Sequence, residues 1–217
     1  MGCGTSQGVP LVAHDNPGID LKNPRNWRTR TSVHVVIEGH HVQVDAAPEF
    51  RLQCLRNDIR DVDTFILTHG HADHVAGNAA LRERWPGLPI LVGRGDADKL
   101  VDPRGNLSAA FGLPFTSPPA DRELSDGDTV ELAGFSLAVT AIPGHSRGHV
   151  VFRVGDTSPP LVIGGDVLFR EGIGRTDFPD GDFATLAAGI RRGLYGLPDA
   201  TVVLPGHGEP TTVGHER

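Results

Sequence analysis

The chain has 217 residues, 38% of them hydrophobic, which suffices for one domain with a buried core over residues 1–217 and leaves little room for two. Its formal net charge of -7 disfavours a nucleic-acid partner, because backbone binding depends on clustered lysine and arginine. No apolar run approaches the ~20 residues that cross a bilayer and no charged-then-apolar leader opens the chain, so we expect a cytoplasmic protein without a membrane partner.

The first predicted elements form a hairpin over residues 31–47, where two runs rich in β-branched residues meet at Glu38 and Gly39. Its histidines lack metal-like spacing, and we interpret them as strand or turn residues: His34, His40 and His41. A buried strand then ends at Thr68, and residues 72–85 predict a helix with one apolar side. The segment between them lies on a strand-to-helix loop, where open α/β sheets bind ligands.

The second half of the chain returns to strands. Residues 98–122 are rich in turn formers and predict a long loop with a short helix, of a length that usually serves function as a lid or a substrate wall. The other predicted elements are a strand at 88–93, a hairpin at 128–144, strands within 149–155 and 160–169, a helix at 183–194 and a last strand within 200–208. This order predicts an α/β fold in which two sheets stack between helices.

Four metal-capable side chains stand together in the sequence "HGHADH", directly after the apolar run that precedes it: His69, His71, Asp73 and His74. Histidines at positions i and i+2 before a tight loop can face one cation. The side chains of Asp73 and His74 point to a neighbouring position about one ion spacing away. Imidazole and carboxylate ligands suit zinc, iron or manganese, and the lack of thiolates argues against a purely structural zinc site.

Further donors follow other apolar strands. His145, Asp166 and His207 each come just after an apolar strand and beside glycine, which allows close approach of backbone and ion. The repetition of this arrangement indicates one shared metal site rather than scattered loop residues.

These residues resemble the HxHxDH motif and the full dinuclear ligand set of the metallo-β-lactamase superfamily. The resemblance implies the four-layer αββα sandwich of that superfamily and two divalent metal ions, zinc in the first place and iron or manganese as alternatives. One ion would be held by His69, His71 and His145, the second by Asp73, His74 and His207, with Asp166 bridging both. The catalytic candidates are Asp73 and Asp166, and two ions together supply hydroxide near neutral pH and stabilise an oxyanion.

Residues 78–217 are similar to the short glyoxalase II-like hydrolases, which cleave S-acylglutathione thioesters such as S-lactoylglutathione. The similarity rests on "LVDPRGNLSAAFGLPFTSPPADR", "GDVLFREGIGRTDFPDGD" and "TVVLPGHGEPTTVGHER". The chain ends before the helical domain that supplies that family's glutathione contacts, which leaves selectivity for glutathione open.

Residues 1–77 resemble instead the phosphodiesterase branch, the relatives of ribosyl cyclic-phosphate phosphodiesterases and tRNA 3'-processing nucleases. The segments are "GCGTSQGVP", "NPRNWRTRTSVHV" and "VDAAPEFRLQCL". The apolar strand that normally precedes the first of them is missing, as is the branch's cysteine cluster. We interpret the change near residues 75–78 as a recombination junction, natural or engineered, with deep divergence as the alternative. A missing first edge strand would leave a sheet edge open to another chain, so a homo-oligomer is expected.

The choice between substrates rests on the leaving group. A thiolate departs without a proton from a general acid, and none is evident near "GIGRTDF", whereas an alkoxide leaving a phosphodiester gains more from such an acid. We therefore favour a thioester as the small-molecule substrate, with a phosphodiesterase and a metal-binding chimera without turnover as alternatives. Arg175 and Asp177 are candidates for substrate contact, with a salt bridge that orders their loop as the alternative. The backbone of Gly4, Thr5 and Ser6 is a further candidate, with a tight turn as the alternative. His149 is expected to orient a strand or a ligand rather than to bind metal.

Overall fold

The computed structural model describes residue 30, residues 32–132 and residues 134–217. The predicted contacts of Gly4, Thr5 and Ser6 lie outside the described residues, and so does the question of a missing first strand. Among the helices that are described, none combines the length and the apolar character needed to cross a membrane.

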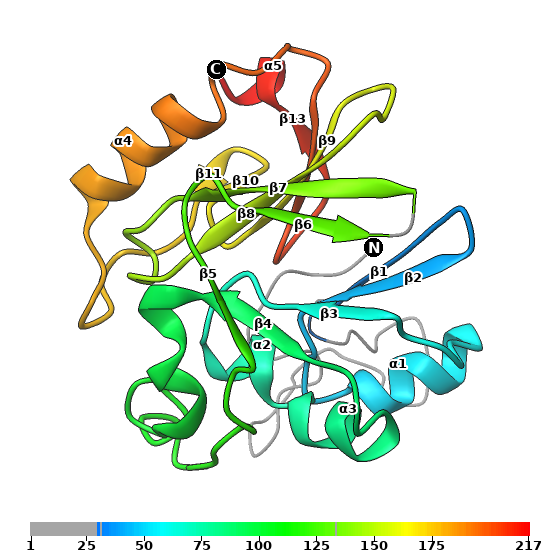
Figure 1. The fold of residues 1–217 in the computed structure, drawn as a ribbon. Helices are drawn as coiled ribbons and strands as arrows, with labels where there is room; N and C mark the ends of the chain where they lie inside the picture. Colours follow the sequence, from blue (N-terminus) through cyan, green and yellow to red (C-terminus); the bar gives the residue numbers. More distant parts are fainter. Residues whose placement is uncertain (1–29, 31, 133) are drawn as a thin grey trace, which may run out of the picture.

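Two sheets form the centre of the fold (Figure 1). The first has five strands in the order β1 (Val33–Ile37), β2 (His40–Val44), β3 (Thr64–Ile66), β4 (Ile90–Gly93) and β5 (Arg122–Leu124). The second has six, in the order β13 (Thr211–Thr212), β12 (Val202–Pro205), β9 (Leu161–Gly165), β8 (Val150–Val154), β7 (Phe135–Ala141) and β6 (Thr129–Leu132). A separate ribbon pairs β10 (Leu168–Phe169) with β11 (Gly172–Ile173).

Helices cover the outer faces of both sheets. The helices are α1 (Phe50–Asn57), α2 (Ala72–Val75), α3 (Asn78–Arg84), α4 (Phe183–Gly193) and α5 (Val213–Glu216), with 3-10 turns η2 (Arg94–Asp96) and η3 (Asp98–Val101). In Figure 1, α1 and α3 lie outside the first sheet and α4 lies outside the second. The predicted αββα sandwich is therefore confirmed.

Alternation along the strands explains why these layers stack. Along β3 and the residue that follows it, Ile66 joins the apolar cluster between the two sheets, whereas Phe65 and Leu67 join the cluster beneath the helices of the first sheet. On the other side, Val151 and Val162 face Leu186, Ile190 and Leu194 of the α4 segment. Both faces of each sheet are buried, as expected for a four-layer fold.

The prediction of one continuous helix over residues 72–85 is wrong, because the chain breaks between α2 and α3. At the break, the Gly77 N–H donates to Ala46 O at 2.7 Å, and a Cβ on Gly77 would lie only 2.6 Å from Ala47 O. The backbone thus leaves the helix in order to pack against the loop after β2. The strand that was expected to end at Thr68 ends at Ile66, since the Thr68 N–H donates to the Asp45 carboxylate.

Several short elements have too little pattern for prediction, among them α1, α5 and β13. The two hairpins and the helix at 183–193 are present as expected, and His34, His40 and His41 lie in β1 and β2. Apolar residues on both sides of positions 75–78 share one buried cluster, such as Phe65 with Leu81. The recombination junction and the homo-oligomer remain hypotheses.

Candidate metal centre

The predicted ligands come from loops that follow four strands of the two sheets. His69 follows β3, His145 follows β7, Asp166 follows β9 and His207 follows β12. The strands are apolar and buried, so they fix the positions where the loops begin, and polar side chains are displayed only beyond the strand ends. This arrangement brings residues that are far apart in sequence to one edge of the sandwich.

The first group of donors contains histidines only. His69 Nε2 lies 3.3 Å from His145 Nε2, and the ring centroids of His71 and His145 are 4.7 Å apart. One ligand atom from each of these side chains lies within 4.8 Å of the other two. The three side chains are buried, so they can surround a single ion without competition from bulk water.

The second group combines Asp73, His74 and His207, whose ligand atoms also lie within 4.8 Å of one another. His207 Nε2 is 3.2 Å from Asp73 Oδ2. Asp166 lies between the groups: its carboxylate oxygens are 3.5 Å from His74 Nε2, 3.6 Å from His145 Nε2 and 3.3 Å from His207 Nε2. The structure thus brings all seven predicted ligands together, with Asp166 between both groups.

Several buried atoms of this cluster make no hydrogen bond within the described part of the chain: His71 Nε2, His74 Nε2, His207 Nε2 and Asp166 Oδ1. Unsatisfied buried polar atoms are rare in folded proteins and call for a partner such as an ion. Imidazole nitrogens with carboxylate oxygens are the ligand set of zinc, iron and manganese sites. The residues therefore fit a pair of divalent ions.

The two groups differ in protonation. Burial, helped by neighbouring imidazoles, lowers the pKa of His69 and His71 well below the ordinary value, and burial also lowers that of His145, so all three are neutral ligands. Burial also lowers the pKa of His74 and His207, but nearby carboxylates raise it by more. Asp45, Asp166 and Asp73 raise the pKa of His74 well above its ordinary value, and Asp166 and Asp73 raise that of His207 to about 9.

A residue that the sequence analysis missed, Asp45, orients one ligand. Its Oδ2 accepts a hydrogen bond from His74 Nδ1 at 2.8 Å, and its carboxylate also accepts from the N–H and hydroxyl of Thr68. Carboxylate partners of this kind fix the orientation of a metal-ligating imidazole. Asp45 follows the apolar strand β2, so the same signal that identified Asp166 could have found it.

Backbone groups orient other ligands. His145 Nδ1 lies 2.8 Å from Arg175 O and can donate to it, which leaves Nε2 facing the cluster. The Asp166 N–H donates to His149 Nε2 at 3.0 Å, and His149 belongs to none of the convergent groups found among the described residues. His149 thus contacts the backbone at Asp166, as expected of a residue that orients a strand or a ligand, and its role stays a prediction.

A buried ionic cluster, also missed, joins the two ligand loops. Asp96 is fully buried, and its oxygens accept the N–H groups of Gly70 at 2.8 Å and Gly148 at 2.9 Å. Lys99, only 4% exposed, lies 3.2 Å from Asp96 and donates to the Ser146 hydroxyl, which in turn donates to Asp96. We call these residues the Asp96 clamp. It holds the loop of His69 and His71 against the loop of His145.

The predicted substrate contacts Arg175 and Asp177 lie beside this centre. Their side chains form a two-point salt bridge at 2.7 Å, and both are exposed. The guanidinium also lies 4.5 Å from the ring centre of Phe178. The bridge that orders the loop is therefore present, and contact with substrate remains a prediction.

Comparison with known proteins agrees with the geometry. The hydroxyacylglutathione hydrolase GloC of Haemophilus influenzae is 38% identical over 160 residues, which cover 72% of this chain and 74% of that protein. The BLEG-1 B3 metallo-beta-lactamase superposes with a TM-score of 0.79 at 30% identity, covering 89% of this chain and 92% of that one. TTHA1623, crystallised in a di-iron-bound form, gives a TM-score of 0.72 at 35% identity, covering 86% and 91%. A family model described as metallo-beta-lactamase superfamily matches residues 25–207, and the chain therefore belongs to this superfamily.

Proposed function

We propose that this protein is a metal-dependent hydrolase that cleaves thioesters of the S-acylglutathione type. The observation that carries the proposal is the convergence of six other imidazole and carboxylate side chains around Asp166. The relative named hydroxyacylglutathione hydrolase supports the thioester class. A small molecule, rather than a membrane or a nucleic acid, is the proposed partner.

The ligand groups suggest how two ions would be held. His69, His71 and His145 would bind one, Asp73, His74 and His207 the other, and Asp166 both. Two such ions together lower the pKa of water, orient it and stabilise the oxyanion that develops on the substrate. We propose zinc, with iron and manganese as the alternatives.

The chain's own residues complete the site. Asp73 is 17% exposed in its side chain, more than the 9% of Asp166, so it is the carboxylate of the cluster that is better placed to orient an incoming water. Asp45 and His149 hold His74 and Asp166 in position through the hydrogen bonds described above. The side chains that would bind metal thus need little rearrangement before reaction, which favours catalysis.

The ionised state of Asp177 is compatible with a thioester substrate. Its hydrogen bonds from Arg175 lower its pKa to about 2, so the carboxyl is ionised near neutral pH and cannot donate a proton to a leaving group. A thiolate leaves without that proton, whereas an alkoxide gains from a general acid. The segment around Arg175 is therefore compatible with a thiolate leaving group.

The test is steady-state hydrolysis of S-lactoylglutathione beside bis(p-nitrophenyl) phosphate by one preparation whose zinc, iron and manganese content has been measured. We expect thioester turnover to exceed phosphodiester turnover. His71→Ala and Asp166→Ala should abolish turnover with little change in far-UV circular dichroism, because the ligands lie on loops outside the apolar clusters.

Three outcomes contradict parts of the proposal. Preferred turnover of the phosphodiester would assign the protein to the phosphodiesterase branch. Bound metal without hydrolysis of either substrate would favour an inactive metal-binding scaffold. Full activity in Asp166→Ala would show that Asp166 is not required and would overturn the assignment of the centre.

A further inference from the structure

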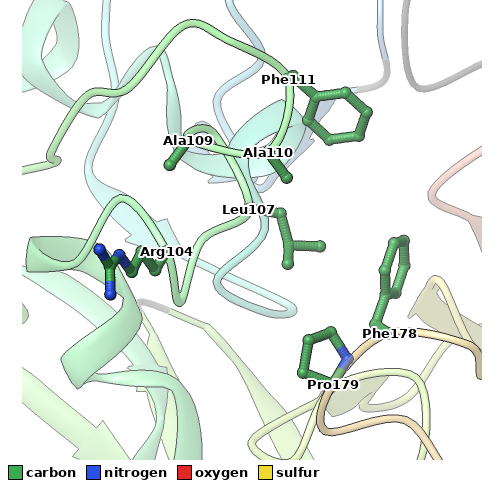
Figure 2. Close-up of a pocket in the computed structure, with 7 residues that line it drawn as sticks. All are labelled: Arg104, Leu107, Ala109, Ala110, Phe111, Phe178 and Pro179. Atoms are coloured by element: carbon green, nitrogen blue, oxygen red, sulfur yellow. The ribbon is translucent and has the colours of Figure 1, made fainter.

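An apolar pocket of about 380 Å³ is formed by two segments that are distant in sequence. Figure 2 shows Leu107, Ala110 and Phe111 on one side and Phe178 and Pro179 on the other. Among the described residues that line the pocket, Arg104 alone is charged, and its guanidinium points away from Leu107 and Phe178. A volume within the ~300–1,000 Å³ typical of ligand pockets and an apolar wall suit a hydrocarbon group.

The pocket adjoins the candidate metal centre through Phe178. The ring of Phe178 meets the ring of His71 edge-on at a centroid distance of 5.0 Å and the ring of His145 at 5.6 Å. One aromatic ring therefore belongs to the walls of both the pocket and the first ligand group. A substituent on the reacting carbon has only a short distance to cover before it enters the pocket.

Hydrogen bonds fix the opposite wall relative to the ligand motif. The N–H of Ala72, which lies between His71 and Asp73, donates to Asn106 O at 2.8 Å. The next residue, Leu107, is buried and has a φ of 70°, a backbone conformation that costs energy for a leucine. The fold thus maintains a strained conformation at the point where Leu107 lines the pocket.

We propose that this pocket receives the acyl chain of the thioester, so that the enzyme prefers unbranched apolar acyl groups of several carbons to acetyl or lactoyl. This inference rests on the proposed function. The thiol side fits this pocket poorly, because glutathione carries two carboxylates and an ammonium group, and the apolar wall between Leu107 and Phe178 would leave them unpaired. The acyl chain is the part of such a substrate that gains from leaving water.

The first test compares S-acetyl-, S-butanoyl-, S-hexanoyl- and S-lactoylglutathione. Each buried methylene is expected to raise kcat/KM by about fourfold, until the pocket is full. S-lactoylglutathione should react more slowly than S-butanoylglutathione, because its hydroxyl would meet an apolar wall.

Two variants with matched controls connect this preference to the pocket. Ala110→Phe should fill the space and remove the advantage of hexanoyl over acetyl, whereas Ala188→Phe, on the exposed side of α4, should keep it. Phe111→Ala should weaken the preference, whereas Leu113→Ala, 72% exposed on the same loop and outside the lining, should not.

A binding measurement separates the pocket from catalysis. Octanoate should shift the alanine methyl NMR signals of the metal-free protein, acetate should not, and the shifts should be lost in Ala110→Phe. Thioester turnover with a flat chain-length profile, or a profile unchanged in Ala110→Phe, would overturn the pocket assignment and leave the thioesterase proposal standing. Absence of turnover with every thioester would overturn the proposed function, and octanoate binding would then support or overturn the apolar pocket separately.

Discussion

The Asp96 clamp offers a sharp test of how the ligand loops are held. Asp96→Asn keeps the shape of the side chain but removes its charge. Lys99, 4% exposed, then retains Asp180 as its carboxylate partner. The N–H group of Gly70 or that of Gly148 then faces the asparagine NH₂ group, which cannot accept a hydrogen bond. The change therefore acts on an ion pair and on one of two loop contacts at once.

The magnitude follows from these contacts. Breaking a buried ion pair costs about 3–5 kcal/mol, and the remaining Asp180 and the surviving amide oxygen place our expectation near the lower end, about 3 kcal/mol. For a chain of this length that corresponds to a fall in Tm of roughly 6–12 °C. The protein should still fold, since domains typically have about 5–15 kcal/mol of stability.

The assay is urea denaturation of the metal-free protein, which removes the contribution of metal binding to stability. Asp98→Asn is the matched control, because Asp98 is an exposed neighbour paired with Arg147 on the surface, and its loss should cost about 1 kcal/mol or less. A free energy of unfolding for Asp96→Asn within 1 kcal/mol of that of Asp98→Asn would refute the reasoning. We also expect weaker zinc binding in Asp96→Asn only, because the clamp joins the loop of His69 and His71 to the loop of His145.

Three further changes address the ligands. Gly206→Ala would place a Cβ 2.0 Å from Asp166 Oδ1, so the carboxylate must move, and we expect kcat to fall about 100-fold with unchanged circular dichroism. Because the pKa of His207 is raised to about 9, zinc added to the metal-free protein at pH 7.5 should release protons, measured with an indicator in weak buffer. Asp45→Asn removes the negative charge of the hydrogen-bond partner of His74, and zinc affinity should fall about 10- to 100-fold in competition with a chelator.

Controls and contrary results are specific to each change. Gly196→Ala, where a Cβ meets no atom within 4 Å, should leave kcat unchanged, and equal kcat values for both glycine variants would contradict the first prediction. Zinc binding without proton release would contradict the second. Asp58→Asn, at a highly exposed carboxylate, is the control for the third, and equal zinc affinities in the two asparagine variants would contradict it.

The proton prediction has a counterpart in stability. The pKa of His207 in the folded metal-free protein lies above its ordinary value of 6.5. The protonated ring therefore stabilises the metal-free fold fully below pH 6.5, and this contribution is lost as the pH rises through about 9. A metal-free Tm that stays constant over this range, or rises, would be evidence against a protonated His207.

The sequence alone determined the layers of the fold and the candidate ligands. Short continuous apolar runs predict strands that are buried on both faces, and a histidine or aspartate directly beyond such a run can be recognised in the sequence. His69, His145, Asp166 and His207 could be found in this way. Which sheet each strand joins was not needed for that prediction.

Only the tertiary structure decided what supports the ligands. Asp45 meets His74 because β2 pairs with β3, and Asp96 meets Gly148 across 52 positions of sequence. The broken helix at Gly77 and the apolar pocket likewise depend on contacts between distant segments. Local patterns carry no information about such partners, because the energy that holds them comes from burial and from the pairing of groups that the completed fold brings together.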